Sequence, residues 1–79
     1  MKKIEVTAQF TATGKIIPLN FNDGNNLCRV HSTGRHWENE LGKHFLVMDI
    51  RQKNYHLIFN TQDCIWYLAN GSQSPSVPV

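Results

Sequence analysis

The sequence predicts an all-β protein, and three observations favour this fold class. Apolar residues alternate with polar ones from Ile4 to Phe10, which is typical of a half-buried strand. Further short apolar runs follow at spacings of about ten residues, as in small barrels and sandwiches. Clusters of Gly, Asn and Asp separate these runs. We therefore expect a five- to six-stranded antiparallel barrel of the SH3-like kind, with an OB-like barrel or a small β-sandwich as alternatives.

The first two predicted strands are joined by a turn at Gly14-Lys15. The second strand places Ile17, Leu19 and Phe21 on one face. Pro18 lies between them, and because proline cannot donate a hydrogen bond to a ladder, it indicates an edge position or a bulge.

The third strand is predicted over Leu27–Ser32, with Cys28 and Val30 on the core face. Asp23-Gly24, in the polar segment before it, favours a hairpin turn. Thr33–Lys43 then shows no period of two, and it predicts a loop in which Trp37–Leu41 leaves room for one helical turn.

The last three strands are predicted over His44–Ile50, Tyr55–Phe59 and Cys64–Ala69, with polar turns between them. The fourth carries Leu46, Met48 and Ile50 on one face and other apolar residues on the opposite face. Strands that are buried on both sides have this composition. Bends of the barrel itself or a second protein chain are the two ways to cover the extra face.

The chain has 79 residues and a formal net charge of +2, which predicts one domain over residues 1–69. Residues 70–79 are rich in Gly, Ser and Pro and predict a disordered tail. No run resembles a signal peptide or a membrane span, so we expect a cytoplasmic protein with no membrane partner. In that compartment Cys28 and Cys64 are expected to be reduced and packed as small hydrophobic residues.

No catalytic constellation is visible, and we expect no enzyme, no cofactor and no metal site. The four histidines lack metal-ligand spacing and are interpreted as hydrogen-bonded imidazoles. His44 and His56 lie in different predicted strands, and only the strand register decides whether they meet. A small hydrolase using His36 with Glu38 or Glu40 is the remaining catalytic hypothesis, since these residue types transfer protons.

Four residues are candidates for a binding surface: Arg29, Arg35, Trp37 and Lys43. The three basic residues among them would form a basic patch with Arg51 and Lys53 if the third strand and the loops around the fourth are adjacent. Trp37 or Tyr55 would offer a ring on which a base stacks.

The order of several short glycine-containing and aromatic motifs along the chain resembles that of other proteins. Gly14-Lys15, Gly34-Arg35-x-Trp37, Gly42-x-His44 and Trp66-Tyr67-Leu68 follow one another in a layout that resembles short uncharacterised bacterial proteins. It is also similar to a domain of unknown function associated with Y-family DNA-polymerase-like proteins. The resemblance covers residues 4 to 69 and implies a compact β domain in a DNA-repair context, without catalytic residues. Residues 22–26 depart from it, since those relatives tend to have a tryptophan and a basic hairpin there.

These observations predict a non-enzymatic accessory or protein-interaction module that binds a protein partner or self-associates. A nucleic-acid-binding barrel is the alternative, and a small hydrolase comes last.

Overall fold

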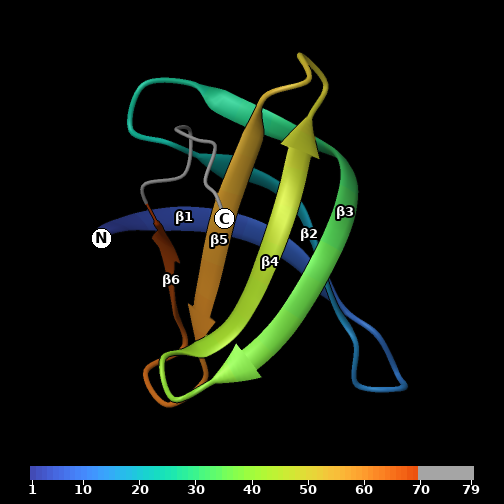
Figure 1. Ribbon diagram of the computed structural model, residues 1–79, viewed down its shortest axis with the longest axis vertical. Coiled ribbons are helices and arrows are strands. Elements are labelled where there is room, and N and C mark those ends of the chain that lie inside the picture. The colour runs from blue at the N-terminus through green and yellow to red at the C-terminus, as the bar shows by residue number, and fades with distance from the viewer. Residues whose placement is uncertain (70–79) are drawn as a thin grey trace.

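A computed structural model describes residues 1–69 as six antiparallel strands that close into a barrel in the order β1-β2-β3-β4-β5-β6 (Figure 1). The prediction of a small antiparallel barrel is thus confirmed. No helix is present among these residues, and none is therefore long and apolar enough to cross a membrane. The predicted tail, residues 70–79, lies outside the described residues. The strands are β1 Lys2–Phe10, β2 Ile16–Asn22, β3 Leu27–Asn39, β4 Gly42–Asp49, β5 Asn54–Asn60 and β6 Ile65–Leu68.

The core is built from alternate residues of the strands, because successive side chains of a strand point to opposite faces. Phe21 and Leu57 are completely buried, and β4 and β5 supply most of the other members. Aromatic contacts dominate: the ring centroids of Phe59 and Trp66 are 4.9 Å apart, and those of Phe21 and Tyr55 are 5.0 Å apart. The buried cluster comprises Phe21, Cys28, Phe45, Val47, Tyr55, Leu57, Phe59 and Trp66.

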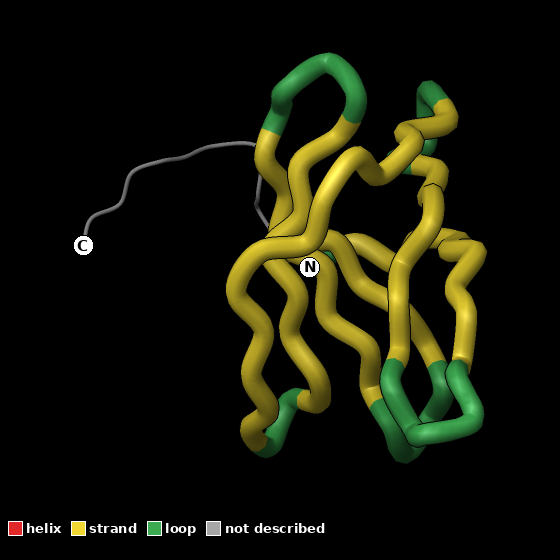
Figure 2. Tube along the Cα trace, turned by 90° about the vertical axis from the view of Figure 1, so that its right-hand side faces the viewer, coloured by secondary structure: helices red, strands yellow, loops and turns green. Residues whose placement is uncertain are grey.

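Asn and Asp side chains fix the hairpin turns. At β4–β5, Asp49 Oδ1 accepts hydrogen bonds from the backbone N–H groups of Arg51 and Lys53, both at 2.9 Å. Asp23 and Asn60 do the same in the turns that they open. These side chains replace the backbone partners that a turn lacks, so the turns form where the sequence predicts them. Figure 2 shows the turns at the two ends of the strands.

A bulge in β2 corrects the predicted face of that strand. Thr7 pairs with Asn20 while Ala8 pairs with Pro18, which leaves Leu19 as the extra residue. An extra residue reverses the alternation beyond it. Pro18 consequently points into the barrel with Phe21, whereas Ile17 and Leu19 are 37% and 44% exposed. The bulge that Pro18 indicated is present, but the shared face of Ile17, Leu19 and Phe21 was wrong.

β3 continues through the segment predicted to be a loop. It runs unbroken to Asn39, so no helical turn forms over Trp37–Leu41 and the prediction there was wrong. Its pairing with β4 shifts twice, between Val30 and Ser32 and between Thr33 and His36. Each shift adds one residue to β3, which hides its period of two and bends it around the barrel.

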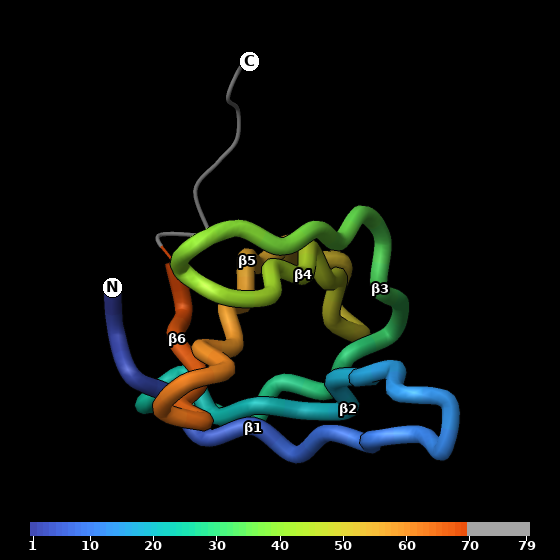
Figure 3. The backbone as a smooth tube through the Cα atoms, turned by 90° about the horizontal axis from the view of Figure 1, so that it is seen from below, coloured from blue at the N-terminus to red at the C-terminus, as the bar shows by residue number. Residues whose placement is uncertain are grey.

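Two further expectations need correction. Cys64 is exposed and lies in the β5–β6 turn with φ of 59°, so it is not packed as a core residue, whereas Cys28 is; both are free thiols. The second face of β4 is covered only in part, since Leu46 is 38% exposed, and Ile50, which lies just beyond the end of β4, is 62% exposed. Viewed along the barrel, β1 and β2 form one side while β3, β4 and β5 form the other (Figure 3).

Candidate functional site

A groove opens where β2 and β3 separate. Their ladder consists of three residue pairs and ends at Asn20 and Arg29. Beyond this point, the ladder pairs of residues 30–39 of β3 are all with β4, among the residues that the structure describes. Residues 16–18 of β2 pair only with β1 there, and Leu19 is the bulged residue. Each strand therefore presents one edge without a ladder partner toward the gap between them.

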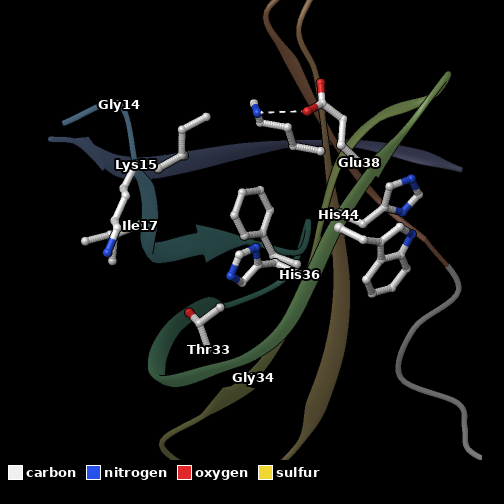
Figure 4. A pocket seen from close by; sticks show the side chains of 12 residues that line it. Gly14, Lys15, Ile17, Thr33, Gly34, His36, Glu38 and His44 are labelled. Atoms are coloured by element: carbon white, nitrogen blue, oxygen red, sulfur yellow. Dashed lines mark hydrogen bonds and ion pairs between the residues drawn. The ribbon is translucent and has the colours of Figure 1, made fainter.

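The groove has a cavity volume of about 590 Å³, which falls within the range of ligand-binding pockets. Phe45 contributes an apolar surface, and the His36 ring stacks on it with centroids 6.4 Å apart. Figure 4 shows Lys15 and Ile17 on one side and Thr33 and His36 on the other. The lining residues are Gly14, Lys15, Ile16, Ile17, Thr33, Gly34, His36, Trp37, Glu38, Lys43, His44 and Phe45.

The charges of the groove are unevenly distributed. Lys43 Nζ lies 3.1 Å from Glu38 Oε1, so these two side chains neutralise one another at one end. Lys15 forms no ion pair with any residue of the range 1–69. The groove consequently has a net positive charge on its β1–β2 side, which favours an anionic group on a bound molecule.

The other face of β3, β4 and β5 carries a cluster of rings. Trp37 and His44 are cross-strand partners, and their rings stack with centroids 4.9 Å apart and an angle of 11°. His56 joins them from β5, with its centroid 5.0 Å from that of His44. Although it lies on the outside of the barrel, His44 is only 3% exposed. We call Trp37, Asn39, His44 and His56 the ring cluster.

Hydrogen bonds fix the protonation pattern of this cluster. Asn39 Oδ1 accepts a bond from the Leu41 N–H, which identifies it as the amide oxygen. His44 Nε2 lies 2.8 Å from the same oxygen and must therefore donate to it. In neutral His44 the Nδ1 atom is then the acceptor, and His56 Nε2, 2.8 Å away, donates to it.

Burial favours the neutral form of both histidines. Burial lowers the pKa of His44 below its ordinary value of 6.5. Burial also lowers the pKa of His56, and the neighbouring His44 adds to this effect. A charged imidazole loses its hydration when it is buried, and no carboxylate of residues 1–69 forms an ion pair with either ring to compensate.

The predicted binding residues are only partly brought together. The Arg35 guanidinium lies over the Trp37 ring, 5.4 Å from its centroid. His44 stacks on the same indole, so the ring face that it covers is closed to a nucleic-acid base. Lys43 is turned to the opposite face and paired with Glu38, and Arg29 lies in the β2–β3 ladder.

The wider basic patch is divided between the two ends of β4. Arg51 lies beyond its end, where Arg51 Nη2 is 3.5 Å from Asp49 Oδ2. The Ile50 N–H donates to the Arg29 carbonyl, which places Arg29 at that end too. Lys43 lies at the start of the strand. No single face collects these charges.

The structure gives little support to the remaining candidates for chemistry, which are a cysteine nucleophile, a His36–Glu38 pair and a metal site. Burial raises the pKa of the Cys28 thiol, and a buried thiol of this kind is a poor nucleophile. Glu38 is occupied by Lys43 and forms no hydrogen bond with His36 in residues 1–69. The same residues hold no group of three or more His, Cys, Asp or Glu side chains that could bind a metal.

The groove and the ring cluster were not predicted. The groove depends on two bulges in β3 that no residue pattern reveals. The sequence does contain a signal for the contact between His44 and His56. A hairpin centred near Arg51 pairs Leu46 with His56 and places His44 diagonally opposite His56. Diagonal neighbours lie within reach of aromatic and long side chains.

No family model, curated protein or solved structure matches this chain. The resemblance to domains associated with Y-family polymerase-like proteins thus stays a hypothesis.

Proposed function

We propose that this protein is a non-enzymatic interaction module that binds an extended polypeptide segment in the groove between β2 and β3. One observation carries the proposal: two strand edges that have no ladder partner within residues 1–69 face the same cavity. Such edges bind an added strand through main-chain hydrogen bonds, while the side chains beside them select its sequence.

The lining of the groove indicates the chemistry of the segment. Ile16, Ile17 and Phe45 favour an apolar side chain facing the cavity. Lys15 favours a carboxylate nearby, since Lys43 is already paired with Glu38. The preferred segment is therefore an extended one in which apolar and acidic residues occur close together.

A nucleic-acid ligand has less support from the same geometry. Backbone phosphates require several unpaired cations along one surface, and here the cations are divided between two ends and partly neutralised. A cytoplasmic location and a protein partner belong to the proposal. A second copy of this chain is one form that the partner can take, and light scattering distinguishes it from a different protein.

The experiment is a titration of ¹⁵N-labelled protein with the acetylated pentapeptide Val-Asp-Val-Asp-Val. We expect amide shift changes along both groove edges, at Ile16, Ile17 and Leu19 and at residues 31–39. The pentapeptide Val-Lys-Val-Lys-Val should bind more weakly because Lys15 repels it. Unchanged spectra, or changes confined to other strands, would contradict the proposal.

A pair of charge reversals tests the role of Lys15. Lys15→Glu should abolish the preference for the acidic peptide. Lys53→Glu changes the net charge equally but lies in the β4–β5 turn, away from the groove lining, and should leave the preference intact. Equal loss in both variants would show that only the net charge matters.

A further inference from the structure

The ring cluster contains a chain of hydrogen bonds with a defined direction. It runs from His56 Nε2–H to His44 Nδ1, and from His44 Nε2–H to Asn39 Oδ1, with 2.8 Å for each step. The 5.0 Å between the two imidazole centroids is close to the nitrogen–nitrogen distance plus the two ring radii. The two nitrogens therefore point at one another, as in a hydrogen bond, and their lone pairs do not converge on a common metal position.

The chain leaves one nitrogen without a partner among the described residues, Nδ1 of His56. His56 is half-buried, whereas His44 is 3% exposed. A first proton can therefore enter at His56 Nδ1 without breaking any bond. The bond from His56 Nε2–H to His44 then becomes charge-assisted, which strengthens it.

A second proton has no such place. It would have to enter at His44 Nδ1, which would then face the His56 Nε2–H group head-on at 2.8 Å. Two donors and two positive charges would share a site that holds no acceptor between them. One of the rings must then leave its position, and the stacking of His44 on Trp37 depends on that position.

We propose that His44 and His56 form a proton-sharing latch that holds β3, β4 and β5 together. The latch stays closed while the pair is neutral or carries one added proton, and it opens when a second proton is added. Asn39 and Trp37 come from β3, His44 from β4 and His56 from β5, so the latch joins three strands. Trp37 and His44 also belong to the groove lining, but the latch does not rest on the proposed function of the groove.

The surroundings of the latch supply little compensating charge. From β3, the Arg35 guanidinium lies over Trp37 and opposes a further positive charge. β4 presents Leu46 opposite His56, and β6 presents Tyr67 opposite Ile58. Glu38 faces the groove, and Glu40 is exposed in the β3–β4 turn without an ion pair in residues 1–69.

The test is an NMR pH titration of the histidine rings in the unmodified protein. At neutral pH, long-range ¹H–¹⁵N spectra should show both His44 and His56 with the proton on Nε2. The pair should titrate in two separate steps. The ring-current shift that Trp37 imposes on His44 should persist through the first step and disappear in the second.

Two results would overturn the latch. One is a proton on Nδ1 of neutral His44. The other is independent titration of both rings near the ordinary value, with the Trp37 ring-current shift unaffected. His31 is exposed, and His31→Gln should leave both steps of the His44–His56 pair unchanged. His56→Gln, which retains a donor group but cannot be charged, should remove one of the two steps.

Discussion

The two faces of the β3–β4 hairpin are built from alternate residues of the same strands, yet they are organised differently. The groove face carries His36, Glu38 and Lys43, which are exposed or half-buried and share one surface ion pair. The outer face carries Trp37 and His44, whose rings are stacked. Hydrogen bonds link His44 to Asn39 on β3 and to His56 on β5. These outer contacts add to the stability that the buried side chains of Phe45 and Val47 provide on the inner face of β4. The polar residues of the groove face remain available for binding.

The largest expected loss of stability comes from a substitution at Gly42, which lies at the start of β4 and affects both faces of the hairpin. Gly42 has φ of 132°, and a Cβ there would clash with the backbone carbonyl of Phe59 on β5. Gly42→Ala should lower the free energy of unfolding by about 3 kcal/mol, because neither backbone can move without breaking the ladder. Urea denaturation measures the loss.

Gly14→Ala is the matched control. Gly14 also has a positive φ, of 89°, but open space surrounds its Cβ position. Gly14→Ala should lower the free energy of unfolding by only about 1 kcal/mol, which is the cost of placing alanine at a positive φ. Equal losses in the two variants would show that the contact with Phe59 contributes nothing.

Removing a ring from the outer face should have the next largest effect. His44→Ala deletes a buried ring and leaves Asn39 and His56 without their partner, so we expect a loss of about 2 kcal/mol in the free energy of unfolding. His44→Phe retains a flat ring over Trp37 but no nitrogen, and should fall between His44→Ala and the native protein. A negligible loss for His44→Ala would contradict the contrast between the faces.

A change on the groove face should have the smallest effect. Glu38→Gln breaks an ion pair whose side chains are 37% and 56% exposed, and pairs of this kind contribute less than about 1 kcal/mol. Thermal denaturation should therefore show almost no shift in Tm. A loss comparable to that of His44→Ala would mean that the groove face also stabilises the hairpin.

The strands were predictable wherever one strong pattern dominated. Period-two alternation located β1, and turn residues located the ends of β4 and β5. Prediction failed at bulges, because one extra residue in β2 exposes Leu19 and two in β3 conceal a strand of 13 residues. Bulges arise from the pairing of two strands, and a single segment does not record that pairing.

The candidate site followed the same rule. Arg35 and Trp37 are two residues apart in the sequence, and the Arg35 guanidinium lies over the Trp37 ring. Lys43 and Arg29 were assigned to that region without knowledge of the face on which each lies. The groove and the histidine chain depend on register across strands, so they could be found only once the barrel was assembled.

The ladder pattern has a consequence for how the chain folds. Within residues 1–69, five ladders join consecutive strands, and one ladder, between Lys2–Ile4 of β1 and Trp66–Leu68 of β6, joins the two ends. Local hairpins close short loops at a small entropic cost, whereas the β1–β6 ladder, which we call the seam, closes a loop of almost the entire described chain. We expect the seam to form last, and its amide hydrogens to exchange with solvent before those of β4 and β5.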